Sequence, residues 1–194
     1  AILLFDESIK KFPKSLEAYP NLASILVIKG RNDIAKKILN KAIELNPKYL
    51  RPYSNLAGIF VGEGDLNKAQ FFLRKSLEIN PKDINNLVNL GCVLKDSGDS
   101  KQAEKYLRYA LKINPRYDFA LINLGAVLNE LEKIDEGEQL LKKALKINPN
   151  SPTALNNLGN ILSKKNNNKD AEICYRKAIA IKSDFSLAYN NLAS

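Results

Sequence analysis

The chain has 194 residues, of which 45% are hydrophobic and 26% are charged, and its formal net charge is +9. This length and composition fit a soluble globular chain that can bury a continuous core. The chain contains no histidine and two cysteines, so it lacks the usual general base and the thiols for a structural zinc site, and we expect no enzyme activity, metal or cofactor. No apolar run reaches the roughly 18 residues of a membrane helix, and we expect no membrane span.

Proline sets the period of the chain, because Pro13, Pro47, Pro81, Pro115 and Pro149 stand 34 residues apart, four of them after an asparagine. If each proline takes place 32 of a repeat, residues 1–15 are a partial repeat. Five full repeats then cover 16–49, 50–83, 84–117, 118–151 and 152–185, and a second partial repeat covers 186–194. We expect a single array over residues 1–194.

Each repeat is predicted to form two amphipathic helices, since apolar residues recur at spacings of three and four, as at Leu155, Leu158 and Leu162. Place 15, between the helices, is Gly30, Gly64, Gly98, Glu132 and Asn166. Glycine and asparagine favour the left-handed backbone conformation of the residue that ends a helix. Glu132 is the one residue at this place that is neither glycine nor asparagine.

The sequence also indicates where the second helix of each repeat begins and where it ends. Asp33, Asp65, Asp99 and Asp135 stand near the expected starts, where a carboxylate caps open amides or meets the positive end of the helix dipole. The Asn–Pro pair is the expected end, because the residue before proline is pushed out of helical geometry.

Three further places hold only small residues, which let two helices approach closely. Place 8 is Ala23, Ala57, Gly91, Gly125, Gly159 and Ala193; place 20 is Ala1, Ala35, Ala69, Ala103, Gly137 and Ala171; place 27 is Ser8, Ala42, Ser76, Ala110, Ala144 and Ala178.

This 34-residue period, with its aligned small residues and late proline, resembles the tetratricopeptide repeat over the whole chain. The resemblance implies an all-α fold, an α-α superhelix that is a right-handed solenoid of antiparallel helix pairs. It also implies a scaffold for protein–protein interaction that binds a peptide or partner segment in a concave groove, which the first helices line through places 2, 5, 6, 9, 12 and 13. The alternative is a substrate-recruiting arm of a larger enzyme, such as a glycosyltransferase.

Asparagine occupies place 6 in every repeat and supplies the main candidate binding residues, which are Asn21, Asn55, Asn89, Asn123, Asn157 and Asn191. A side-chain amide both donates and accepts hydrogen bonds, so such a row can bind the main chain of a peptide. The alternative is that each asparagine ties one helix to its neighbour. Further uncharged candidates on the same expected surface are Asn85, Asn156 and Asn160.

Apolar candidates on this surface are Val27, Ile28, Val88, Phe119, Ile122 and Leu187. Phe119 is the expected anchor, because an aromatic side chain on an inner face has no core to fill; the alternative is that it packs against the next repeat. The carboxylate clamp of some members of the resembling family is absent, since place 5 holds no lysine.

The basic residues lie mostly on second helices and turns, as at Lys101, Lys105, Arg108, Lys112 and Arg116, and we expect them to face solvent. Because the expected groove holds few cations, we expect a protein or peptide partner and no nucleic acid.

Cys92 and Cys174 are more than two repeats apart. We therefore expect the distance between their Cα atoms to exceed the roughly 7 Å that a disulfide can span. We therefore expect two free thiols and a cytoplasmic location. The first residue stands at place 20 and the chain has no methionine, so we expect a fragment of a longer protein. Apolar residues at its ends, Leu3, Leu4, Tyr189 and Leu192, predict self-association of this fragment.

Overall fold

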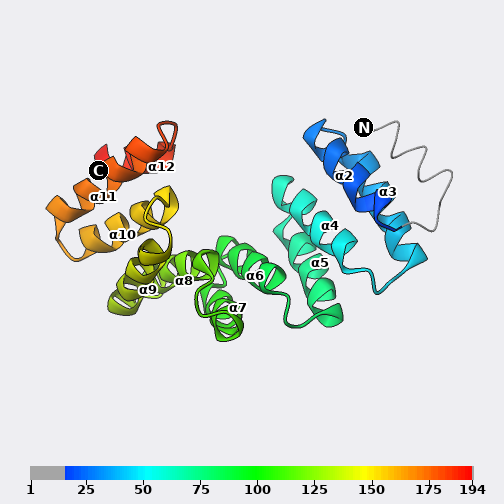
Figure 1. The fold of residues 1–194 in the computed structure, drawn as a ribbon, viewed down its shortest axis with the longest axis horizontal. Helices are drawn as coiled ribbons and strands as arrows, with labels where there is room; N and C mark the ends of the chain where they lie inside the picture. The colour runs from blue at the N-terminus through cyan, green and yellow to red at the C-terminus, as the bar shows by residue number, and fades with distance from the viewer. Residues whose placement is uncertain (1–15, 194) are drawn as a thin grey trace. The chain divides into compact units, whose positions relative to one another are not determined.

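The computed structural model describes residues 16–193, and this part of the chain consists of α-helices and connecting segments without a strand (Figure 1). The helices are α2 (Ala18–Ile28), α3 (Asn32–Leu45), α4 (Leu50–Gly62), α5 (Leu66–Ile79), α6 (Ile84–Asp96), α7 (Ser100–Ile113), α8 (Asp118–Glu130), α9 (Ile134–Ile147), α10 (Pro152–Lys164), α11 (Asn168–Ile181) and α12 (Ser186–Ala193). The predicted all-α fold class is confirmed.

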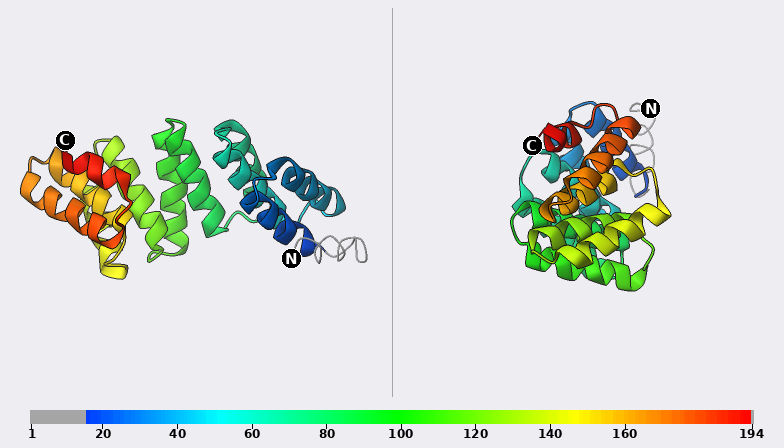
Figure 2. Two further views of the ribbon diagram at one scale, coloured as in Figure 1. Left: turned by 90° about the horizontal axis from the view of Figure 1, so that it is seen from above. Right: turned by 90° about the vertical axis from the view of Figure 1, so that its left-hand side faces the viewer.

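Where both helices of a repeat lie in one unit, they lie side by side as an antiparallel pair (Figures 1 and 2). These pairs are α2 with α3, α4 with α5, α8 with α9 and α10 with α11. The second helix of a repeat also contacts the first helix of the next, as α3 contacts α4 and α9 contacts α10. A repeat therefore buries its apolar faces partly within itself and partly against its neighbour.

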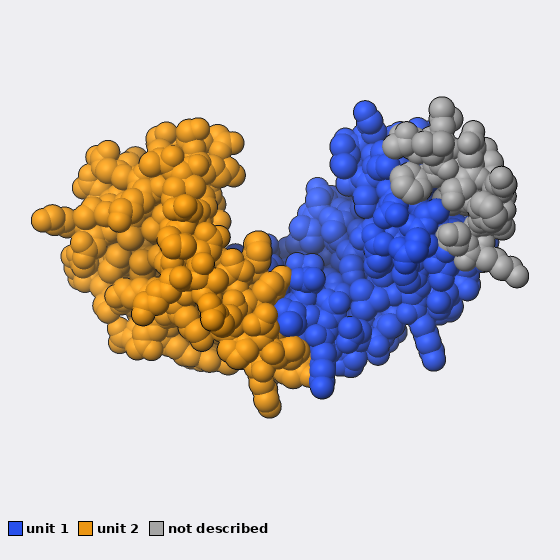
Figure 3. Space-filling view, in the orientation of Figure 1, with its two compact units in different colours: residues 1–97 blue, residues 98–194 orange. Residues whose placement is uncertain are grey.

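The chain divides into two compact units, residues 1–97 and 98–194 (Figure 3). The described part of unit 1 holds α2 to α6, and that of unit 2 holds α7 to α12. The core of unit 1 contains Leu22, Leu26, Leu39, Leu56 and Ile59. The core of unit 2 contains Leu121, Leu141, Leu158 and Ile161. That the two units continue as one array stays a prediction.

The Asn–Pro pairs end the second helices as predicted. Asn46, Asn80, Asn114 and Asn148 are the C-terminal caps of α3, α5, α7 and α9. Each side-chain oxygen also accepts a hydrogen bond from the backbone N–H two residues later, at 3.0 to 3.2 Å. Asparagine thus ends the helix and begins the turn in one step.

Two of the four aspartates are caps in the strict sense. Asp65 accepts a hydrogen bond from the backbone N–H of Lys68 at 3.0 Å, and Asp99 accepts one from Gln102 at 3.1 Å. Asp33 and Asp135 instead lie within the first turns of α3 and α9. Their charge there still meets the positive end of the helix dipole.

The turn inside each repeat keeps one backbone conformation whatever the residue type. Gly30, Gly64 and Gly98 have φ of 70°, 77° and 86°, and Asn166 has 59°. Glu132 has φ of 57°, so it takes the left-handed conformation although its side chain disfavours it. The repeat geometry therefore overrides the local preference of Glu132.

The paired helices approach each other most closely at the small residues. Ala35, Ala69 and Ala103, at place 20, are fully buried. A Cβ added to Gly125 would lie 2.7 Å from Cγ of Leu141, and one added to Gly159 would lie 2.8 Å from Cδ1 of Tyr175. The expected close approach at these places is confirmed.

An ion pair joins the second helix α9 to the turn that follows the first helix of the next repeat, α10. Glu138 accepts hydrogen bonds from Nζ of Lys165 in the next repeat at 2.8 Å and from Nζ of Lys142 in its own helix at 2.5 Å. These two bonds hold the pKa of the Glu138 carboxyl below its usual value. The carboxylate therefore stabilises the fold at neutral pH, and this contribution is lost as the pH falls through the lowered pKa.

We predict that Glu138→Gln lowers the melting temperature at pH 7 by about 2 °C, because a partly exposed ion pair contributes less than about 1 kcal/mol. The difference from the wild-type chain should vanish as the pH falls below the usual range of glutamate. Glu172→Gln is the matched control, since Glu172 stands at the same place of the next repeat and, among residues 16–193, pairs only with Arg176 in its own helix. A pH-independent difference for Glu138→Gln would contradict the ion-pair explanation.

We predict that Glu132→Gly raises the free energy of unfolding by about 1 kcal/mol, because glycine relieves the left-handed strain. The loss of the exposed ion pair with Lys164 should subtract little. Gly98→Ala, at the equivalent turn with φ of 86°, should lower the free energy of unfolding by about as much. Urea titration of both variants measures these opposite signs, and a change of equal sign would contradict the shared-turn explanation.

Candidate binding surface

The first helices of unit 1 border two adjoining hollows. The first, of about 330 Å³, is lined by α2 and α4 through Ser24, Val27, Ile28, Ser54, Asn55 and Gly58. The second, of about 220 Å³, is lined by α4 and α6 through Ser54, Gly58, Val61, Asn89, Cys92 and Asp96. Because Ser54 and Gly58 line both, the hollows form one surface, which we call the unit-1 groove. These residues fall at the predicted places 5, 6, 9, 12 and 13.

Aliphatic side chains border the unit-1 groove and face solvent. The exposed fractions of Val27, Ile28 and Val61 are 37%, 82% and 43%. Burial of this apolar surface by a partner is favourable by about 25 cal/mol per Å². Val61 was not among the sequence candidates, although valine at place 12 of two successive repeats, at Val27 and Val61, is a signal for it.

Two of the apolar candidates are wrong as surface residues. Val88 and Ile122 are 5% and 7% exposed, and Ile122 belongs to the core of unit 2. Both stand at place 5, where a large apolar side chain turns into the interior between helices. Phe119 and Leu187, at place 2, are 60% and 58% exposed and remain candidates.

Gly58 keeps the floor of the unit-1 groove open. It lies within α4, and a Cβ at this position would meet no atom within 4 Å. Glycine in a helix interior costs about 1 kcal/mol relative to alanine. Packing gives no reason for that cost, unlike at Gly159, where the ring of Tyr175 fills the space.

The asparagines of unit 1 differ in their surroundings. Asn21 accepts a hydrogen bond from Arg51 at 3.1 Å, and Asn55 donates a long one to the carbonyl of Pro20 at 3.4 Å. Asn89 is exposed at the second hollow. Asn85, one turn earlier on α6, is also exposed. Asn55 and Asn89 are therefore the row members that the structure places in the unit-1 groove.

The asparagines of unit 2 mostly bind other residues of the chain. Asn191 donates to the side-chain oxygens of Asn156 and Asn160, both at 2.9 Å, and so ties α12 to α10. Asn156 is only 4% exposed. Asn123 donates to the carbonyl of Phe119 in its own helix at 2.7 Å, while Asn157 is half-buried. The alternative role of a helix tie therefore applies at Asn191.

Models of the tetratricopeptide repeat family match residues 16–49 and 50–83, residues 72–105, and residues 118–184. The chain belongs to the tetratricopeptide repeat family. No curated protein sequence matches it significantly.

Solved tetratricopeptide structures share this fold. YrrB, described as a TPR protein with an unusual peptide-binding site, is 24% identical with a TM-score of 0.75 over 100% of both chains. PilF of Pseudomonas aeruginosa is 22% identical with a TM-score of 0.74, over 91% of this chain and 88% of its own. MamA of Desulfovibrio magneticus RS-1, residues 41 to the end, is 19% identical with a TM-score of 0.75, over 88% and 96%. At these identities the likeness concerns the fold alone.

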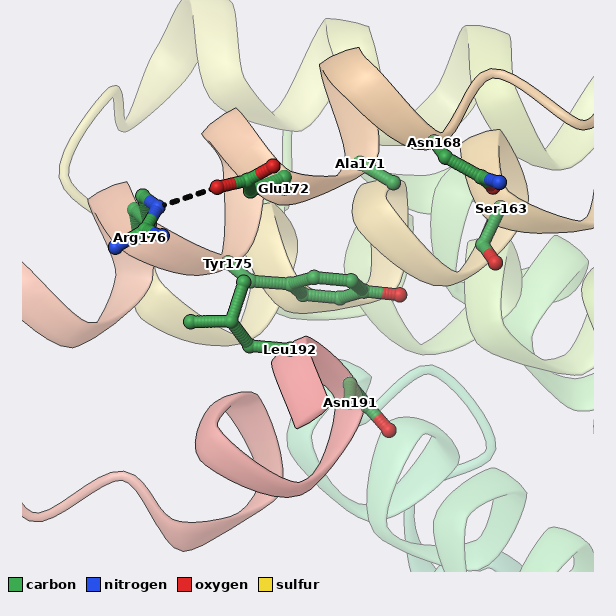
Figure 4. A pocket seen from close by; sticks show the side chains of 8 residues that line it. All are labelled: Ser163, Asn168, Ala171, Glu172, Tyr175, Arg176, Asn191 and Leu192. Atoms are coloured by element: carbon green, nitrogen blue, oxygen red, sulfur yellow. Dashed lines mark hydrogen bonds and ion pairs between the residues drawn. The ribbon is translucent and has the colours of Figure 1, made fainter. Parts of the chain in front are cut away.

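A third hollow of this tetratricopeptide chain, of about 430 Å³, lies at α11 and α12 in unit 2 (Figure 4). Several of its polar side chains bond to other residues of the chain. Arg176 pairs with Glu172 at 2.7 Å, and the hydroxyl of Tyr175 donates to Asn160 at 2.9 Å. Asn191 belongs to the tie described above. Leu192 also lines this hollow and is half-buried, while Tyr189 is exposed; Leu3 and Leu4 lie outside the described residues, so self-association stays a prediction.

The thiol that lines the unit-1 groove is poorly suited to nucleophilic chemistry. Burial raises the pKa of the Cys92 thiol to about 11, so this thiol is protonated at neutral pH. Both cysteines are free.

Within residues 16–193, no three histidine, cysteine, aspartate or glutamate side chains gather where a metal ion could be held. Over the same residues no helix has the length and apolar character needed to cross a bilayer.

We predict that alanine has opposite effects at two glycines of the first helices. Gly58→Ala should raise the free energy of unfolding by about 1 kcal/mol, because the site is open and alanine favours the helix. Gly159→Ala should lower it by about 1 to 3 kcal/mol, because its Cβ meets the ring of Tyr175. Thermal and urea unfolding of both variants measures the difference. Destabilisation by Gly58→Ala would show that the space above Gly58 is filled in the folded chain.

Proposed function

We propose that the unit-1 groove holds a segment of a partner protein, so that the chain works as an interaction scaffold. Tetratricopeptide repeats generally serve protein–protein interaction. The single observation that carries the proposal is the open, aliphatic-rimmed surface above Gly58, where a helix contains a glycine that no packing contact requires.

The chemistry of the unit-1 groove fits a segment with apolar side chains. Such side chains would enter the two hollows and cover Val27, Ile28 and Val61. The amides of Asn55 and Asn89 stand in successive repeats and can bond the main chain of the segment. Specificity then comes from side-chain size above Gly58, and sequence-independent affinity comes from the amides.

Two further points bear on this proposal. The description of YrrB as having a peptide-binding site supports it by analogy of fold. A recruiting arm of a larger enzyme would use the same surface. That alternative therefore differs in the role of the partner and not in the place where the partner binds.

Phe119, with its ring 5.9 Å from that of Tyr117, is proposed as a separate apolar contact in unit 2.

The test begins with peptides selected from a random display library on the full chain, whose affinity is then measured by calorimetry. We predict that Gly58→Leu weakens binding of the selected peptides at least about tenfold, because leucine fills the floor of both hollows. The Asn55→Ala and Asn89→Ala pair should weaken it about tenfold through two lost hydrogen bonds.

Gln139→Leu is the control for the added leucine, because Gln139 is exposed on α9 in unit 2. It should leave the affinity unchanged. Helical circular dichroism must be intact in every variant. If folded Gly58→Leu binds the selected peptides as tightly as the wild-type chain does, the unit-1 groove is not the binding surface.

A further inference from the structure

The unit-1 groove carries one charged side chain, and that side chain is a carboxylate. Among the described residues that line its two hollows, Asp96 alone is charged. It lines the second hollow together with Val61, Asn89 and Cys92, and its side chain is 52% exposed. A segment in the unit-1 groove would therefore meet aliphatic side chains, amides and a single negative charge.

Asp96 occupies an unfavourable place in its helix. It is the last residue of α6, and the C-terminal end of a helix carries a partial negative charge that destabilises a carboxylate. A neutral or basic residue would suit this end better. Because half of the side chain is exposed, packing of α6 does not explain why a carboxylate stands here.

Other charged residues at the same place bond to the preceding repeat. Place 13 is the last position of the first helices, and Glu130 and Lys164 are its other charged residues. Glu130 accepts a hydrogen bond from Oγ of Ser100 at 2.6 Å, and Lys164 pairs with Glu132 at 2.9 Å. Among residues 16–193, Asp96 makes no such bond to the preceding repeat. Its carboxylate therefore does not serve the stacking of repeats.

Lys95 is the one cation that pairs with Asp96 among the described residues. The distance from its Nζ to Oδ1 of Asp96 is 3.1 Å. The two residues are neighbours in α6, where successive side chains point about 100° apart, and a partly exposed pair of this kind contributes little free energy. The pair uses one oxygen of a carboxylate that has two acceptors. Asp96 can therefore bind a second cation.

We propose that the segment held in the unit-1 groove carries a lysine or arginine that pairs with Asp96, beside apolar side chains that enter the two hollows. This inference rests on the proposed function of the groove and adds a determinant of specificity to it. The net charge of the whole chain is +9, so its long-range field opposes a basic segment. Selection of a basic segment would therefore report the local pair with Asp96.

The surroundings of Asp96 favour a long basic side chain over other cations. Lysine and arginine have aliphatic stems that cover apolar surface while the charged head reaches a polar group. Val61 lines the same hollow as Asp96 and is 43% exposed, so a stem can cover Val61 while its head pairs with the carboxylate. A metal ion instead needs several oxygen ligands, and Asp96 supplies the one carboxylate of the lining.

The test uses the full chain and the peptides selected from the display library. Each peptide is made in three versions, in which its lysine and arginine residues are kept, changed to glutamine or changed to glutamate. Calorimetry at physiological salt should show the basic version binding at least about threefold more tightly than the glutamine version, and the glutamate version most weakly. The net charge of the chain alone would give the opposite order. Equal affinities, or selected peptides without lysine or arginine, would overturn the proposal.

Substitution of Asp96 should change this order. Asp96→Asn should make the basic and glutamine versions bind equally, and Asp96→Lys should make the glutamate version bind more tightly than the basic one. Glu78→Lys is the matched control, since Glu78 is exposed on α5 and the change in net charge is the same. It should keep the wild-type order. A wild-type order in folded Asp96→Lys, or the same reversal in Glu78→Lys, would overturn the proposal.

Gly58→Leu separates this inference from the proposed function. If it weakens all three versions while Asp96→Asn leaves the order unchanged, the unit-1 groove is the binding surface and the pair with Asp96 is wrong. If folded Gly58→Leu binds all three versions as tightly as the wild-type chain does, both the groove and the pair are wrong. We expect Gly58→Leu to weaken every version and Asp96→Asn to remove the preference for the basic one.

Discussion

Close packing of paired helices at small residues is the constraint on which the rest of this structure depends. Where the first helix carries Gly125 or Gly159, the second helix places Leu141 or Tyr175 directly against its backbone, and no Cβ fits between them. The contact fixes which side of a first helix faces its partner. In unit 1 the same place holds Ala23 and Ala57, which are buried, and the side that stays free carries Ser54 and Gly58.

Two glycines in first helices show how one residue type serves two purposes. Gly159 at place 8 lets a tyrosine ring approach, whereas Gly58 at place 9 faces open space. One place along the helix is enough to change from packing to access, because successive residues of a helix point about 100° apart. Asparagine likewise has two roles in this chain. Asn191 bonds to a neighbouring helix, whereas the side chain of Asn89 is exposed.

The sequence alone predicts the period, the helix ends and the small contacts, because these depend on interactions inside one repeat. The Asn46–Pro47 pair is an example, since its cap and turn involve only adjacent residues. The roles of individual groove residues depend on neighbouring repeats instead. Asn156 is buried and bonds to Asn191, 35 residues further along the chain, and local spacing does not report such a contact. The positive φ of Glu132 is a different case, in which the turn between α8 and α9 sets a backbone angle that the residue type disfavours.

The most direct test of the central claim, that partners bind on the free sides of first helices in unit 1, is a map of backbone amide chemical shifts. Spectra of the isotope-labelled full chain would be recorded with and without a tightly binding peptide from the display selection, and the two sets would be compared. We expect the largest shifts at Ser24, Gly58, Val61 and Asn89. Shifts confined to the second helices α3 and α5, or to unit 2, would contradict the claim.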